Sequence, residues 1–172
     1  YQEESAHQYD RYAQFVKQNA PQVAELATPR PLPAREFQRR LQPGEAVLAT
    51  VVTPQDLYVW AVTPTGVAFA RQAVGERAVG ALVQRLRAGL VPGSGDGATK
   101  LPPFDAAAAH EIHQLVFAPV AAALKGVTSI VWYGHGPLGS VPPAVLVSAP
   151  PARPKLSTPA EFAATKFLVD QY

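Results

Sequence analysis

The sequence predicts an α/β fold, in which a mixed β-sheet with an antiparallel meander at one side carries helices on its faces. Three observations lead to this prediction. Residues 46–71 are rich in β-branched and aromatic side chains and are divided by turn signals, as consecutive short strands are. Two amphipathic helical patterns follow, at 76–90 and 104–125. Residues 128–133 then form an apolar run without polar alternation, which is typical of a parallel strand covered on both faces.

Length and composition favour one compact domain with a lead-in segment. A chain of 172 residues can bury about 70% of the surface that its unfolded form exposes. The net charge is +2, and no run of Lys and Arg is interleaved with aromatic residues, so we expect no nucleic-acid partner. No apolar stretch reaches the ~18 residues that a membrane span requires. We therefore expect no membrane partner and a cytoplasmic location.

The chain contains no cysteine, which excludes disulfides, thiolate metal ligands and a cysteine nucleophile from this chain. It contains no methionine either, even at position 1. We expect the chain to be processed or to be part of a longer protein, with further residues beyond both ends.

Residues 1–33 are expected to form a helical lead-in and a proline-rich linker. Apolar side chains recur at near-helical spacing within residues 1–18, and four prolines fall between positions 21 and 33. The helix either packs on its own domain or ends a preceding helical array. Residues 34–41 are compatible with two helical turns that stop at Pro43 and Gly44.

The meander is expected to comprise strands at 46–53, 57–63 and 67–71. Pro54-Gln55-Asp56 separates the first two strands, and Thr63-Pro64-Thr65-Gly66 is a turn sequence before the third. Tyr58 and Trp60 could suggest a site for stacking a ligand, but packing in the core or at an edge is the expected role of such aromatic side chains.

The helix expected at 76–90 has one apolar face and opposite charges at its two ends, consistent with the helix dipole. In the pattern at 104–125, Asp105 is a plausible N-cap and Pro119 should kink or divide the helix. The glycine-rich connection between them, 92–103, lacks the Gly-Lys-Ser/Thr sequence of a phosphate loop. His110 and His113 stand three residues apart, unlike zinc-binding H-E-x-x-H, and are expected on the helix surface.

The loop after the strand at 128–133 is the candidate site, because open α/β sheets place clefts at the carboxyl ends of strands. Its residues are Gly134, His135, Gly136, Pro137 and Leu138. A dinucleotide site is disfavoured because Pro142-Pro143 interrupts the required helix and the first downstream acid is Glu161. Two interpretations stay open on the residues alone. Either His135 is a general base, since His-Gly after a strand is similar to the motif of caspase-like cysteine peptidases, or the loop is a turn in which His135 bonds locally.

The order of the elements resembles the amino-terminal half of CHAT domains, which are caspase-like domains often found behind tetratricopeptide repeats. The resemblance covers residues 34–172. It is carried by Leu41-Gln42-Pro43-Gly44-Glu45-Ala46-Val47-Leu48, the meander, Phe104-Asp105, Ile112-His113-Gln114-Leu115-Val116-Phe117-Ala118-Pro119-Val120, and Ile130–Leu146 with Gly136-Pro137-Leu138 and Val141-Pro142. Phe167–Tyr172 looks like the next strand of the family. His135 stands where the family usually has aspartate, and Pro143 where an aromatic residue is common.

The resemblance implies a layered caspase-like sheet that is incomplete at its C-terminal side. In the family the catalytic histidine and cysteine belong to a later half, so no catalytic residue, cofactor or metal is expected in this chain. The expected role is a structural framework and interaction surface for a cysteine-peptidase half, in the same protein or in a separate chain. Upstream helical repeats would be a second partner, and an unpaired strand edge would favour homo-oligomers.

Two alternatives belong to other functional classes. The chain could be a self-contained bacterial scaffold or interaction domain without protease activity. It could also be a small hydrolase that uses His135 with Ser140, although the sequence around Ser140 lacks the G-x-S-x-G elbow.

Overall fold

The computed structural model describes residues 14–16, 18–19, 32–90 and 102–172, and the chain divides into two compact units, 1–37 and 38–172. In the first unit, residues 14–16 and 18–19 are helical. Most of the expected lead-in helix, linker and 92–103 connection lies outside the described residues. Helix α3, Ala34–Gln38, has five residues and is therefore shorter than the two turns expected at 34–41.

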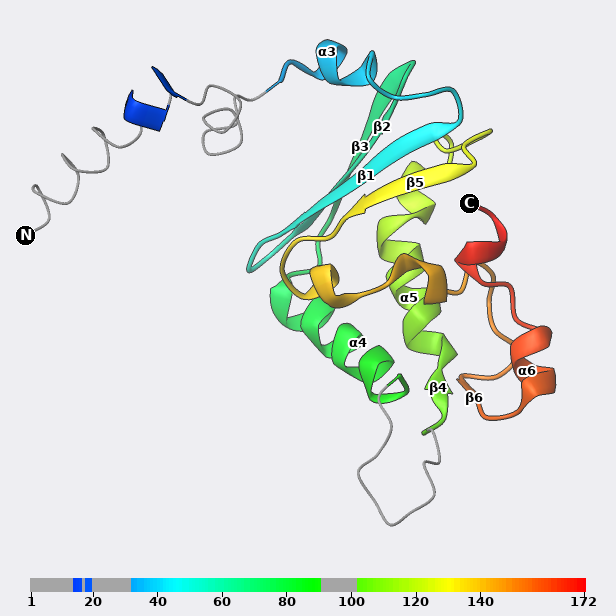
Figure 1. Cartoon of the computed structure of the whole chain (residues 1–172). Coiled ribbons are helices and arrows are strands. Elements are labelled where there is room, and N and C mark those ends of the chain that lie inside the picture. Colours follow the sequence, from blue (N-terminus) through cyan, green and yellow to red (C-terminus); the bar gives the residue numbers. More distant parts are fainter. Residues whose placement is uncertain (1–13, 17, 20–31, 91–101) are drawn as a thin grey trace, which may run out of the picture. The chain divides into compact units, whose positions relative to one another are not determined.

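The second unit is built on an open four-stranded mixed sheet with the strand order β3-β2-β1-β5 (Figure 1). Its strands are β1 (Glu45–Val52), β2 (Leu57–Thr63), β3 (Gly66–Gln72) and β5 (Ser129–Tyr133). The first three pair antiparallel, and β5 pairs parallel to β1 with Glu45 opposite Ser129. The predicted meander and the predicted parallel strand are both confirmed.

Side chains fix the two turns of the meander. In the first turn, the Thr53 Oγ1 accepts a hydrogen bond from the Asp56 N–H at 3.0 Å. In the second, the Thr63 Oγ1 accepts one from the Gly66 N–H at 3.1 Å. The Arg71 guanidinium on β3 donates two hydrogen bonds of 3.0 Å to the Asp56 carboxylate. This bidentate pair joins β3 to the β1–β2 turn.

Helices α4 (Glu76–Ala88) and α5 (Ala106–Val116) lie together against one face of the sheet (Figure 1). Strand β4, Phe104–Asp105, precedes α5, and the Asp105 carboxylate accepts a hydrogen bond from the Ala108 N–H at 2.8 Å, as the predicted N-cap should. The Arg85 guanidinium of α4 also contacts Asp105, at 3.2 Å, and so ties the two helices together. Pro119 lies in the 3₁₀ helix η1, Ala118–Val120, so the predicted division of the long helical pattern is confirmed.

Short elements follow β5: η2 (Gly136–Ser140), η3 (Pro143–Val145), β6 (Lys155–Leu156), α6 (Pro159–Ala163) and η4 (Leu168–Asp170). Strand β6 pairs antiparallel with β4. The prediction of a strand at 167–172 is wrong. Phe167 forms a single antiparallel bridge with Val147, and the chain then turns into η4.

Two hydrogen bonds, one of them local, fix this turn in place of a strand. The Asp170 carboxylate accepts a hydrogen bond from the Phe167 N–H at 3.2 Å, and the Leu168 N–H donates to the Leu146 carbonyl at 2.8 Å. A carboxylate that binds an N–H three residues earlier stabilises a turn in competition with an extended strand. Within the described ranges, none of the helices has the length and apolar character needed to cross a bilayer.

Candidate functional site

His135 joins the loop after β5 to the end of β1. Its backbone N–H donates to the Thr50 Oγ1 at 3.1 Å, and its Nδ1 accepts from the Val52 N–H at 3.2 Å. A neutral imidazole that accepts at Nδ1 carries its proton at Nε2. The ring therefore satisfies a backbone donor that strand pairing leaves open, and this donor lies 83 residues away on β1 and not within the turn itself, where the turn interpretation expected the bond.

The other residues of the candidate loop make a tight 3₁₀ turn. A Cβ atom on Gly134 would lie 2.5 Å from the carbonyl oxygen of Leu138, so only glycine fits there without a shift of the backbone. Gly136 has φ +59°, in the left-handed region that favours glycine. Leu138 is 1% exposed and belongs to the core. The turn continues as η2 and not as the α-helix on which a dinucleotide pyrophosphate would rest.

The structure does not assemble His135 and Ser140 as a base and nucleophile. The Ser140 hydroxyl donates to the Pro137 carbonyl at 2.9 Å, within its own turn. The His135 Nδ1 is bound to the Val52 N–H. A serine nucleophile needs its hydroxyl within hydrogen-bond reach of the base, and here both side chains are bonded to backbone groups instead.

His110 and His113 of α5 are half-buried in a stack of rings, which corrects their expected place on the helix surface. The His110 Nδ1 lies 2.9 Å from the Val147 carbonyl. The ring centroids of His113 and Phe117 are 5.7 Å apart, and those of Phe117 and Trp132 are 6.1 Å apart. Burial, together with the neighbouring His110, lowers the pKa of His113. Within residues 14–16, 18–19, 32–90 and 102–172, no cluster of three or more metal-binding side chains occurs.

The two faces of the sheet differ in what covers them. The inner face carries Leu48, Val59 and Ala61, which are fully buried beneath the described helices. We call the opposite side the outer face. Apart from Glu45, Ser129 and Arg71 at its margins, its side chains are all apolar or aromatic: Val47, Ala49, Val51, Tyr58, Trp60, Val62, Val67, Phe69, Val131 and Tyr133.

Much of the outer face is exposed to solvent. Phe69 is 56% exposed, Val131 55% and Tyr133 64%. The centroids of the Trp60 and Phe69 rings are 5.3 Å apart, and Tyr58 lies 6.1 Å from Trp60, so these rings pack on one another across β2 and β3. A fold with helices on both faces was expected, yet none of the described helices of the second unit covers this one.

Strand β5 is the last strand at its side of the sheet. It pairs with β1 along one edge, and no strand in the described part of the chain pairs with the other edge. An unpaired strand edge is what the resemblance implies, and β5 provides one in the described part of the chain. Backbone N–H and C=O groups along an unpaired edge are available to a further strand.

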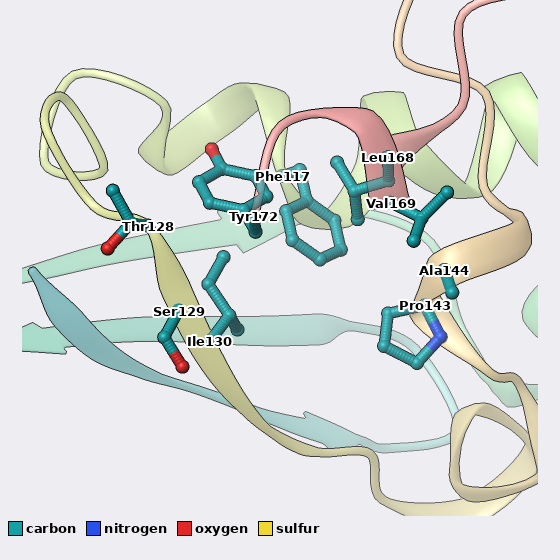
Figure 2. A pocket seen from close by; sticks show the side chains of 9 residues that line it. All are labelled: Phe117, Thr128, Ser129, Ile130, Pro143, Ala144, Leu168, Val169 and Tyr172. Carbon is teal, nitrogen blue, oxygen red and sulfur yellow. The ribbon is translucent and has the colours of Figure 1, made fainter.

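An apolar cavity of about 250 Å³ lies beside the start of β5, on the side away from β1 (Figure 2). Its walls come from the first residues of β5 and the residue before them, from η3, η4 and Tyr172, and from the residue after α5. Burial raises the pKa of the Tyr172 hydroxyl. The lining residues carry no charge: Phe117, Thr128, Ser129, Ile130, Pro143, Ala144, Leu168, Val169 and Tyr172.

Comparison with known proteins yields no significant match to a protein-family model, a curated sequence or a solved structure.

Proposed function

We propose that this chain is the non-catalytic half of a CHAT peptidase-like domain, a framework and interaction surface for a cysteine-peptidase half located elsewhere. The observation that supports the proposal most directly is the apolar, exposed outer face of the sheet. An antiparallel sheet with one face in water carries polar side chains at alternate positions, whereas strands covered on both faces are apolar at nearly every position. The outer face is mainly apolar in all four strands and so has the composition of a covered face.

The size of the outer face fits a layer of helices. Four strands spaced about 4.8 Å apart, with five to eight residues each at about 3.3 Å per residue, cover roughly 430 Å². A helix with its side chains is about 10 Å wide, so two helices fit side by side, as α4 and α5 do on the inner face. A second helical layer from the peptidase half would complete a layered caspase-like arrangement.

The residues of this chain agree with a supporting role in such a domain. A cysteine peptidase acts through a thiolate, and the chain has no cysteine to supply it. His135 binds the Val52 N–H, so its role in the proposal is to fix the loop and not to act as a base. The thiol and its general base would both come from the other half.

The first test is the complete reading frame that encodes the chain. The proposal expects a downstream segment with a His-Gly sequence after a predicted strand, and a cysteine later in that segment. A stop codon after Tyr172, with no such segment encoded beside it, would favour a self-contained scaffold instead.

The second test is reconstitution. The 1–172 chain alone should bind a hydrophobic dye at the outer face and cleave no peptide, and addition of the cysteine-containing half should remove dye binding. The variant Phe69→Lys should bind that half at least tenfold more weakly. Gln84→Lys, at an exposed position of α4, is the matched control and should bind normally. Equal binding of both variants would contradict the role of the outer face.

A further inference from the structure

We infer that the free edge of β5 and the adjacent cavity form one attachment site, at which an extended segment adds as a fifth strand and places an aromatic side chain in the cavity. The inference rests on the proposed function, because it commits to the peptidase half as the source of that segment. It adds the mode of attachment and the chemistry of the residues that attach. Two neighbouring features of the structure support it.

The first feature is the edge itself. Its backbone groups favour an extended partner, since only a strand offers donors and acceptors at matching intervals. Side chains next to the edge are apolar on both sides of the sheet. Ile130 and Trp132 face inward, and Val131 and Tyr133 face outward. An added strand would therefore place both of its faces against apolar neighbours, which requires apolar side chains at consecutive positions.

The second feature is the cavity, which lies against the start of β5 and has the inward-facing Ile130 in its wall (Figure 2). We expect an inward-pointing side chain of the added strand to enter it. Its volume of about 250 Å³ exceeds the ~150 Å³ that holds a benzene molecule in an engineered protein cavity. Phe117 and Tyr172 contribute aromatic walls, with ring centroids 6.5 Å apart and planes inclined by 31°. The absence of charge in the lining favours an uncharged aromatic anchor such as phenylalanine.

Edge and cavity together select one kind of occupant. A helix could fill the cavity but would leave the backbone groups of β5 unpaired. A polar strand could pair with β5 but would leave the cavity and the side chains of Val131 and Tyr133 exposed. An apolar strand with a central aromatic residue satisfies both features at once.

The inference can be tested with synthetic peptides and the 1–172 chain. The probe is a fluorescent seven-residue peptide with β-branched residues on both sides of a central phenylalanine and lysines at its ends. Binding is measured by fluorescence anisotropy. Replacement of the central phenylalanine by alanine should weaken binding at least tenfold. Methylation of alternate backbone nitrogens should abolish binding when it blocks the edge that faces β5, and should leave binding intact when it blocks the other edge.

Protein variants provide the complementary test. Ala144→Trp places a large side chain in the cavity from an exposed position and should weaken binding of the peptide at least tenfold. Ala121→Trp, at an exposed position after η1, is the matched control and should have no effect. Circular dichroism verifies that both variants fold. Peptide binding that is unchanged in Ala144→Trp, or that is lost equally with either set of methylated nitrogens, would overturn the inference.

The same variants separate this inference from the proposed function. If the peptidase half binds the unmodified chain and Ala144→Trp equally well, the attachment site is wrong and the proposed function stands. If the peptides bind as expected but no cysteine-containing half binds, the site stands and its assigned source is wrong. If Ala144→Trp instead converts a dimer into a monomer and no peptide binds, the edge pairs with a second copy and the inference is overturned.

Discussion

The same chemical change on opposite faces of the sheet should have very different effects on stability. Replacing valine with threonine keeps the shape of the side chain and exchanges a methyl group for a hydroxyl. Val59 on the inner face is 0% exposed, whereas Val131 on the outer face is 55% exposed. The comparison therefore isolates the environment of each face from the size of the side chain.

The expected change in the free energy of unfolding depends on whether the new hydroxyl is buried or meets water. Burying a hydroxyl that lacks a hydrogen-bond partner costs about 1–3 kcal/mol, so Val59→Thr should lower the free energy of unfolding by about 2 kcal/mol. Val131→Thr leaves its hydroxyl in contact with water and should change the free energy of unfolding by less than about 0.5 kcal/mol. For a unit of this size, about 2 kcal/mol corresponds to a fall in Tm of roughly 5–10 °C.

Urea denaturation of the two variants and the unmodified chain, followed by circular dichroism, measures the difference. The two-state midpoint and slope give the free energy of unfolding for each. If Val131→Thr is as destabilising as Val59→Thr, the outer face is buried in the isolated chain. The physical basis of the proposed interaction surface would then be refuted.

Four further predictions concern other parts of the molecule. Asp105→Ala should lower the free energy of unfolding by about 1–2 kcal/mol through loss of the α5 cap, while Asp105→Asn, which retains a capping oxygen, should lose less; thermal denaturation distinguishes them. The folded state lowers the pKa of His113, so the unfolded chain binds more protons than the folded chain as pH falls through about 6.5. The free energy of unfolding should therefore decrease as pH falls through that range. His113→Phe should reduce this pH dependence. Gly134→Ala should destabilise the chain, because the new Cβ would lie 2.5 Å from a backbone oxygen. Gly66→Ala is the control and should be tolerated, because its Cβ would meet no atom within 4 Å. An equal Tm for the two variants would contradict the tight turn after β5. Light scattering should show that the chain self-associates at high concentration and that Phe69→Lys reduces this, because exposed apolar surface drives association; a monomer at every concentration would count against it.

The sheet and its main helices could be predicted from the sequence because their signals are local. Strands β1 and β2 are β-branched and aromatic and are separated by turn residues, and α4 repeats apolar residues with the period of a helix. The error at 167–172 has a local origin as well. A short apolar run is compatible with a strand or a turn. Here the hydrogen bond from the Phe167 N–H to the Asp170 carboxylate stabilises the turn.

The candidate site was less predictable because it depends on contacts between distant parts of the chain. His135 bonds to residues 83 and 85 positions away, so its role depends on the pairing of β5 with β1 and not on the motif around it. The cavity brings together residues from five separate segments and has no signal of its own in the sequence. A signal for the outer face does exist. Leu57-Tyr58-Val59-Trp60-Ala61-Val62 is apolar at both odd and even positions, which favours a strand with two covered faces.

The most direct test of the central claim is the size of the particle formed when the 1–172 chain is mixed with the proposed cysteine-containing half. Size-exclusion chromatography with light scattering should show a one-to-one complex that no longer binds a hydrophobic dye and that cleaves a peptide only while its thiol is unmodified. Two components that elute separately, with dye binding by the 1–172 chain unchanged, would contradict the account.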